Sequence, residues 1–238
     1  MQDDANSIIS KISPKRLFAL LRFKFLKKHP WAEYGSNTHL KQKQYRTYQD
    51  YLDHQKQKLG RIKKQMVEYD VNYHGLLLSR LKERGYAKPG MTVLCLAARL
   101  GTEVKSFLDL GCFALGIDLN PGKENKYVVF GDFHNIQYPD KLVDIVFCNS
   151  LDHSLDLKKL IREIKRVLKP NGYAILELVK GKDEGGGVGY WESIAWQNAN
   201  DVLKMFNEEG FATEDVQQFE QPWGGYHVTM RLSADNAS

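Results

Sequence analysis

Cysteine is scarce in this sequence, and its three copies share no metal-binding spacing. They are Cys95, Cys112 and Cys148; no two form a C-x-x-C pair, and two of them lie in apolar runs. An odd number of cysteines in such settings indicates reduced, buried thiols and a cytosolic type of compartment. We therefore expect a cytoplasmic protein with neither a disulfide framework nor a zinc site.

Long apolar runs are also missing. No run approaches the roughly 18 residues needed to cross a bilayer, and the first residues lack a basic stretch followed by an apolar one. The chain has 238 residues, of which 42% are hydrophobic, and this is enough for one good core. We expect a soluble, untargeted protein made of one domain with an appendage.

The net charge of +5 is unevenly distributed along the chain. Residues 1–90 contain 19 Lys and Arg against 8 Asp and Glu, a balance of +11, whereas the later residues contain 15 against 21, a balance of −6. A basic first part favours an anionic partner such as RNA, a phosphorylated sugar carrier or a membrane surface. The alternative is the solvated face of long helices, which often carry this much lysine.

Residues 1–90 are rich in Lys and Gln and show no strand pattern. One helix is predicted to begin near Ser13 and Pro14 and to end before Pro30. Its apolar positions are scattered, which favours packing onto the body or a partner chain over lying on a membrane. A second helix should end at Gly85, after basic residues in its last turn. We interpret this part as a basic helical region that contacts substrate or a partner, such as a second copy in a homodimer.

Residues 91–238 alternate between strand and helix patterns. This alternation predicts a doubly wound, mainly parallel sheet with a closing antiparallel hairpin. The expected strands are 92–98, 113–120, 126–133, 142–151 and 173–181, with a hairpin over 212–233. The expected helices are 101–111, 154–172 (ended by Pro170-Asn171-Gly172) and 191–210.

Polar residues follow several of these strands, where ligands bind in such sheets. Asp118 follows the second strand, about 20 residues after the first loop, where a carboxylate can accept hydrogen bonds from a ribose diol. Asp132 and Phe133 follow the third strand and could provide an acceptor and an apolar wall. The combination suits a ligand of the adenosine type, although each residue alone could serve only as a turn or strand-end residue.

The stretches "ALGIDLNPG" and "GDFHNIQYPDKLVDIVFCNSLDHSLDLKKLIREIKRVLKPNGYAILEL", in this order, resemble the class I S-adenosylmethionine-dependent methyltransferases. The resemblance is greatest to the group that methylates small molecules, lipids and glycans, and it covers about residues 93–179. It implies a seven-stranded Rossmann-like fold, S-adenosylmethionine as cofactor and a small-molecule or glycan acceptor. It also implies these cofactor-binding residues: Ala97, Arg99, Gly101, Asp118, Leu119, Asp132, Phe133, Asn149 and Ser150.

The roles of these residues follow from the family's motifs. Asp118 matches the acidic residue that binds the ribose hydroxyls. Asp132 and Phe133 match the pair that holds the adenine through a carboxylate and a backbone amide. Asn149 and Ser150 match the strand end that lies against the methionyl part of the cofactor.

The first loop departs from the family pattern of an acidic residue followed by three glycines. Those places hold Cys95, Ala97, Arg99 and Gly101. Arg99 could pair with the methionyl carboxylate of the cofactor, because guanidinium and carboxylate fit bidentately. Alternatively, the loop is degenerate and binds the cofactor weakly. Glu103 could restore the lost negative charge, or serve only as a helix-dipole partner.

A hydroxyl acceptor would require a general base. His153 is the first candidate, with Asp152 beside it; His134 is second and His227 third, because histidine titrates near neutral pH. A divalent metal held by Asp152, His153 and Asp156 is conceivable, but the spacing is not specific, and we predict no metal site.

The segment "DEGGGVGYWES" after the fifth strand is typical of a mobile lid or of a plain surface loop. In the first case, Tyr190 and Trp191 would stack on a flat substrate or a sugar face.

We expect O-methylation of a small molecule or a glycan sugar. The alternatives are methylation of RNA or protein, against which "NSLDH" lacks the residues that place an amino acceptor, and a non-catalytic binding module. A nicotinamide dehydrogenase is disfavoured because no G-x-G-x-x-G is present.

Overall fold

The structure is a computed structural model that describes residues 29–233, apart from the side chains of residues 37–38 and 59–68. The described residues from Trp31 onward belong to one compact unit. The helix predicted between Ser13 and Pro30 lies almost entirely outside the described residues. Within the described part, none of the helices has the length and apolar character needed to cross a membrane.

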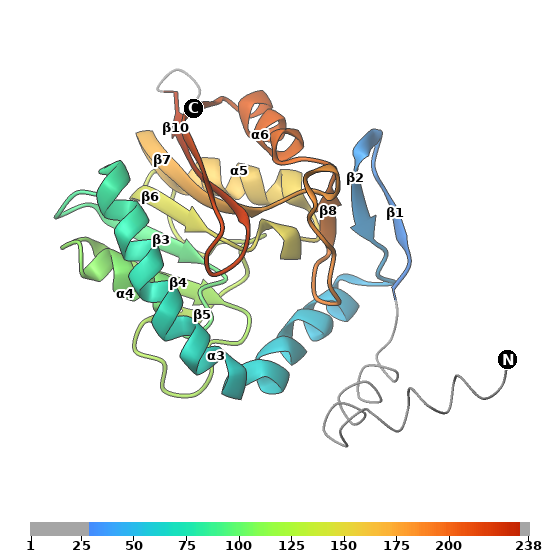
Figure 1. The fold of residues 1–238 in the computed structure, drawn as a ribbon, viewed down its shortest axis with the longest axis horizontal. Helices are drawn as coiled ribbons and strands as arrows, with labels where there is room; N and C mark the ends of the chain where they lie inside the picture. The colour runs from blue at the N-terminus through green and yellow to red at the C-terminus, as the bar shows by residue number, and fades with distance from the viewer. Residues whose placement is uncertain (1–28, 234–238) are drawn as a thin grey trace, which may run out of the picture. The chain divides into compact units, whose positions relative to one another are not determined.

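A seven-stranded sheet forms the centre of this unit, as the sequence predicts (Figure 1). Its order is β5-β4-β3-β6-β7-β10-β9, and β10 runs antiparallel to both of its neighbours. The strands are β3 (Thr92–Leu96), β4 (Phe113–Asp118), β5 (Val128–Phe130), β6 (Val143–Cys148), β7 (Leu168–Val179), β9 (Phe211–Phe219) and β10 (Gly225–Leu232). The strand order reverses beside β3, which places a crevice at the carboxyl ends of β3 and β6.

Helices cover both faces of this sheet. On one face, α3 (Tyr48–Arg84) and α4 (Thr102–Leu108) enclose a buried cluster that includes Tyr73, Leu77 and Phe107. The other face is covered by α5 (Leu157–Val167) and α6 (Ala199–Glu208). The apolar residues Leu157, Leu160, Ile161 and Ile164 recur on one side of α5 and are all fully buried. Each such side chain contributes about 1.5–3 kcal/mol by leaving water.

The long helix α3 brings the first part of the chain onto the crevice. The Thr47 hydroxyl caps its first turn by accepting from the Asp50 amide at 3.1 Å. At the other end Gly85 adopts a left-handed conformation (φ 68°), which confirms the predicted helix end. Residues of its first turns cross the carboxyl ends of the sheet strands, whereas its last turns pack beside α4.

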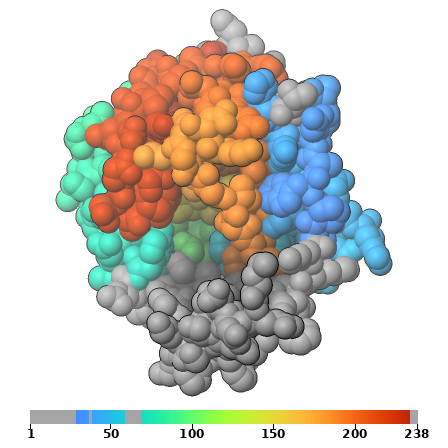
Figure 2. Space-filling model, turned by 45° about the vertical axis from the view of Figure 1, so that its right-hand side comes forward, coloured from blue at the N-terminus to red at the C-terminus, as the bar shows by residue number. Residues whose placement is uncertain are grey.

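A second, three-stranded sheet corrects two expectations. The prediction that residues 1–90 contain no strands is wrong, because β1 (Trp31–Tyr34) and β2 (Asn37–Lys43) form a hairpin. The helix predicted from residue 191 is wrong over β8 (Ile194–Trp196), which pairs with β2. In Figure 2 the segment around β8 (orange) lies between the β1–β2 hairpin (blue) and the β9–β10 hairpin (red). This strand forms because of tertiary contacts. Ile194 and Trp196 are buried and the residue between them is less so, but an alternation over three residues is too short to be recognised in the sequence.

One predicted helix also ends earlier than expected. The structure ends α5 at Val167 and begins β7 at Leu168, whereas the sequence predicts that Pro170-Asn171-Gly172 stops the helix. The residue before a proline is disfavoured in the helical region. The chain therefore leaves the helix ahead of Pro170.

Candidate functional site

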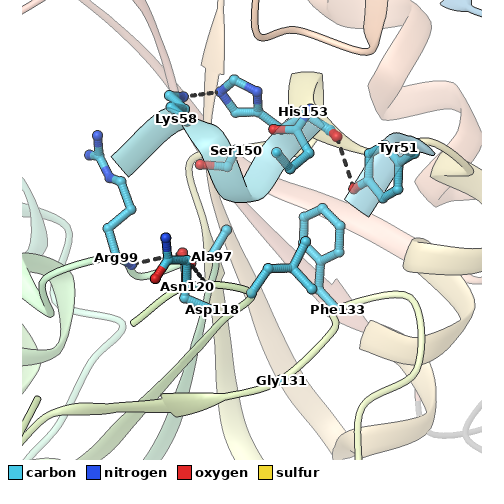
Figure 3. Close-up of a pocket in the computed structure, with 12 residues that line it drawn as sticks. Tyr51, Lys58, Ala97, Arg99, Asp118, Asn120, Gly131, Phe133, Ser150 and His153 are labelled. Atoms are coloured by element: carbon cyan, nitrogen blue, oxygen red, sulfur yellow. Dashed lines mark hydrogen bonds between the residues drawn. The ribbon is translucent and has the colours of Figure 1, made fainter. Parts of the chain in front are cut away.

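A cleft opens at the carboxyl ends of the parallel strands, with α3 across it (Figure 3). It encloses about 580 Å³ of space free of protein atoms, counted to its open mouth. Seven of the predicted residues line it: Ala97, Arg99, Asp118, Leu119, Phe133, Ser150 and His153. Five further residues complete the lining: Tyr51, Gln55, Lys58, Asn120 and Gly131. Gly101, Asp132, Asn149, Asp152 and His134, also predicted, lie outside this lining.

The first loop keeps a left-handed backbone at the three places where glycine is expected. The φ angles are 52° at Ala97, 43° at Arg99 and 85° at Gly101. Left-handed backbone costs a residue with a side chain about 1–2 kcal/mol. Ala97 and Arg99 therefore adopt a conformation that glycine adopts more easily, and the surrounding packing must offset the strain.

Gly101 has a second reason to be glycine. A Cβ atom at this position would lie 2.6 Å from Cβ of Tyr127, closer than such atoms approach in real structures. Tyr127 precedes β5, so the first loop packs directly against the edge of the sheet.

Asp118 is held at the end of β4 by two backbone amides. Its carboxylate accepts from the amide of Arg99 at 3.0 Å and from the amide of Asn120 at 2.7 Å. Burial raises the pKa of this carboxyl group, and the two amide hydrogen bonds oppose the rise. Each carboxylate oxygen can accept a further hydrogen bond. Because Asp118 lines the cleft, it can receive two neighbouring hydroxyl groups of a ligand.

Arg99 and Glu103 are the charged residues of the first loop and the start of α4. The Arg99 side chain rises from the loop along one side of the cleft (Figure 3), and its guanidinium carbon lies 5.9 Å from the centre of the Tyr69 ring. Burial raises the pKa of Glu103 to about 7, although the positive charge of Arg99 opposes the rise. The Asn149 side-chain amide donates to Glu103 Oε1 at 2.9 Å.

Cys95 does not line the cleft. Its side chain is fully buried in the core between the sheet and α3–α4, and burial raises the pKa of its thiol. Glu103 is thus the buried carboxyl group beside the first loop. It lies in the first turn of α4, so a role toward the cofactor and a role as a helix-dipole partner both remain predictions.

Asp132 and His134 form a structural unit behind the cleft wall. The Asp132 carboxylate accepts from the Tyr48 hydroxyl at 2.5 Å and from the His134 amide at 2.9 Å. Burial raises the pKa of Asp132, but the hydrogen bonds from His134 and Tyr48 lower it by more. The net pKa is therefore below its usual value.

His134 uses both ring nitrogens within the protein. Nε2 accepts from the amides of Leu155 and Asp156, each at 3.2 Å, and Nδ1 lies 3.3 Å from Asp132 Oδ1. His134 is fully buried and outside the cleft lining, so its place is that of a residue that fixes the chain before α5.

His153 reaches the cleft, and a lysine meets it there. Its Nδ1 lies 2.9 Å from the Trp191 carbonyl oxygen, so Nδ1 carries the proton and Nε2 keeps its lone pair. Lys58 Nζ donates to this Nε2 at 2.6 Å. Burial lowers the pKa of Lys58 to about 8, with a further lowering from Arg99. Burial and the Lys58 charge hold the pKa of His153 well below its usual range.

Two carboxyl groups lie beside this pair. Asp152, Glu192 and His153 bring one ligand-type atom each to within 4.8 Å of one another. Burial raises the pKa of Asp152 to about 6, against the opposing charge of Lys58. The Lys58 ammonium contacts His153 Nε2 within this cluster, and the absence of a metal ion there stays a prediction.

Three further residues named in the sequence analysis have other places in the structure. Asp156 caps α5 by accepting from the Lys159 amide at 2.9 Å, and it is absent from the cluster. His227 is fully buried on β10, 3.1 Å from Glu177 Oε1, and does not line the cleft. Trp191 stacks on His54 of α3 at 5.2 Å between ring centres, so this ring is engaged with the protein.

The contribution of α3 to the cleft was not among the predicted features. Tyr51, Gln55 and Lys58 are spaced by four and three residues, so they share one face of the helix. That spacing is visible in the sequence, but the sequence does not say which face of a long polar helix meets the sheet.

Comparison with known proteins agrees with this fold. A family described as "Methyltransferase domain" matches residues 94–176. Among proteins with curated functions, none matches the chain in sequence. The chain is similar in structure to a SAM-dependent methyltransferase from Aquifex aeolicus, with 20% identity over 65% of this chain and 89% of that chain and a TM-score of 0.54.

Two further structures illustrate what the fold supports. One is the 1,6-didemethyltoxoflavin-N1-methyltransferase of Burkholderia thailandensis, with bound 1,6-didemethyltoxoflavin and S-adenosylhomocysteine. The identity is 13% over 85% of this chain and 100% of that chain, and the TM-score is 0.65. The other is the [4+2]-cyclase SpnF, with 18% identity over 66% and 80% and a TM-score of 0.54. Residues 94–176 thus carry a methyltransferase-type domain, and the sheet has the fold of the class I methyltransferases.

Proposed function

We propose that this protein is an S-adenosylmethionine-dependent methyltransferase. The observation that carries the proposal is the position of Asp118, partly buried in the wall of the cleft with acceptor capacity remaining, next to a first loop with left-handed backbone. The match to a methyltransferase domain supports the same conclusion.

Residues in and beside the cleft can be matched to each part of this cofactor. Asp118 would accept from the two ribose hydroxyls, Phe133 would offer an apolar wall to the adenine, and Gly131 leaves that wall without a side chain. At the other end Arg99 would pair with the methionyl carboxylate, since a guanidinium binds a carboxylate through two parallel hydrogen bonds. Glu103 would face the positive charge of the methionyl ammonium.

The bound cofactor would supply a methyl group already activated on a sulfonium, so that transfer depends mainly on proximity and alignment. The protein must therefore align an acceptor and remove its proton. We infer that the acceptor is a hydroxyl group of a small molecule or of a glycan sugar. Among the histidines proposed from the sequence, His153 alone lines the cleft, and the His153–Lys58 pair is where a proton would leave.

Titration calorimetry with S-adenosylmethionine and S-adenosylhomocysteine tests the cofactor. We expect one molecule of either ligand per chain. Asp118→Ala should weaken binding by about 100-fold or more, because two hydrogen bonds to a charged group contribute about 1.5–3 kcal/mol each. Asp109→Ala, a half-exposed aspartate outside the cleft lining, is the matched control and should bind as the wild type does. Absence of binding at millimolar ligand would leave only a non-catalytic module.

A further inference from the structure

We propose that Lys58 is the catalytic base that takes the proton from the methyl acceptor, and that His153 positions Lys58. The proposal rests on methyl transfer as the proposed function and names the residue that performs its proton step. It also supports the hydroxyl acceptor proposed above.

The first reason is position. Lys58 lies on α3, faces the cleft and lies opposite the strand-end residues in Figure 3. It is one helical turn from Gln55, which also lines the cleft. A group at this place can reach an acceptor that lies between α3 and the strand ends.

The second reason is the contact with His153. The Trp191 carbonyl fixes the imidazole proton on Nδ1, so Nε2 can only accept, and Lys58 Nζ donates to it at 2.6 Å. A neutral amine that gives one N–H to His153 retains its lone pair for another direction. His153 therefore orients the lysine, and its own lone pair is already in use.

The third reason is the set of charges around the ammonium. Arg99 and Asp118 act on Lys58 from the strand-end loops, and two carboxyl groups, Asp152 and Glu192, act on it from beside His153. Burial and Arg99 favour the neutral amine, whereas the carboxylates favour the ammonium, and together they lower the pKa of Lys58 to about 8. The group is thus partly neutral near physiological pH, as a general base requires.

The proton step balances without a further reactant. The hydroxyl proton of the acceptor passes to Lys58 Nζ while the acceptor oxygen bonds to the methyl carbon. The carbon–sulfur bond breaks, and its electron pair returns to sulfur. The ammonium that forms lies beside Asp152 and Glu192, which stabilise its charge. An acceptor that already carries an ammonium would be repelled by Arg99 and by this cation, which favours hydroxyl acceptors.

Competitive amine labelling measures the titration of Lys58 directly. Trace acetic anhydride would be added across a pH series to the full chain, with Nα-acetyllysine as internal standard, and the peptide containing Lys58 quantified by mass spectrometry. We expect half-maximal reactivity near pH 8, well below that of the standard. Titration at the ordinary lysine value, near 10.4, would overturn the proposal, because the residue would then be a fixed cation.

Variants separate the base from a cofactor ligand. Lys58→Met and Lys58→Arg should bind S-adenosylhomocysteine within threefold of the wild type, as should the control Lys56→Met, which lies on the same helix outside the cleft lining. Loss of binding in Lys58→Met alone would make Lys58 a cofactor ligand and overturn the proposal. Loss of binding by the wild type would instead overturn the proposed function.

Transfer of a labelled methyl group to a panel of phenols and sugars completes the test. For an accepted compound we expect Lys58→Met and Lys58→Arg to lower kcat by 100-fold or more, in the range of general-base catalysis. The wild-type rate should rise with pH and level off above about 8. A wild-type rate that is flat from pH 6 to 9, or full activity of Lys58→Arg, would refute a lysine base.

Discussion

Replacing Gly101 with alanine tests how tightly the first loop is built against the sheet. Two effects of the substitution lower the free energy of unfolding. The left-handed backbone (φ 85°) costs alanine about 1–2 kcal/mol. The new Cβ would lie 2.6 Å from Tyr127 Cβ, an atom next to the backbone that cannot rotate away, and overpacking of this kind costs about 1–3 kcal/mol.

A smaller effect has the opposite sign. Alanine has fewer unfolded conformations than glycine, which stabilises the folded protein by about 0.4–1 kcal/mol. The expected loss in the free energy of unfolding is therefore about 2–4 kcal/mol. In a domain of this size each kcal/mol lowers Tm by about 2–4 °C. Gly101→Ala should unfold roughly 4–16 °C below the wild type, and its binding of S-adenosylhomocysteine should weaken because the loop must shift.

Gly185 provides the matched control, because its backbone is the same and its surroundings are open. Its φ angle is 83°, and a Cβ there would meet nothing within 4 Å. Gly185→Ala therefore carries only the backbone term and should lose about 1 kcal/mol. The difference between the two variants in thermal unfolding isolates the contact with Tyr127. If they unfold within 2 °C of each other, the reasoning about close packing is refuted.

Two further changes probe the same region. Ala97→Gly relieves a left-handed alanine (φ 52°) and should leave Tm unchanged or raise it. Ala98→Gly, next to it, removes a buried Cβ and should lower Tm by a few degrees. Equal losses of Tm in the two variants would contradict strain at Ala97. Glu103→Gln should change the pH dependence of unfolding. The raised pKa of Glu103, about 7 against 4.5, means that the folded wild type binds an extra proton between these values and loses stability as pH rises through them. The variant should therefore gain on the order of 2 kcal/mol relative to the wild type between pH 5 and 8, and a difference that is constant with pH in chemical denaturation would contradict the buried carboxyl group.

The strand and helix periods are sufficient to predict the central sheet. In β3, β4 and β6 the apolar runs end at polar residues, and this pattern is enough to place Asp118 and Ser150 at the crevice, where the structure has them. Parallel strands must end at the same edge, so the residues after them meet irrespective of details elsewhere. The prediction therefore succeeds where a topological rule connects sequence position to location.

The remaining features depend on tertiary contacts that no local pattern records. Lys58 reaches the cleft because a helix of 37 residues crosses the strand ends at one particular rotation. His134 and His153 look alike in sequence, each following a strand, yet His134 is bonded on both sides to backbone and carboxylate whereas His153 faces the cleft. The short strand β8 exists because β2 offers it a partner.

The left-handed backbone at Ala97 and Arg99 is the least predictable feature of the site. Residues with side chains seldom adopt it, so the sequence alone leaves open a loop of different shape. The structure keeps the turn with alanine and arginine in place of glycine, and this places the Arg99 side chain along the cleft. The proposed pairing of Arg99 with the methionyl carboxylate of the cofactor depends on this turn.

A crystal structure of the full chain with S-adenosylhomocysteine tests the central proposal most directly. It should show the ribose hydroxyls within hydrogen-bond distance of the Asp118 carboxylate, the adenine against Phe133 and the methionyl carboxylate at the Arg99 guanidinium. A ligand bound elsewhere on the protein, or a cleft that remains empty at saturating ligand, would contradict the proposal that this cleft holds the methyl donor.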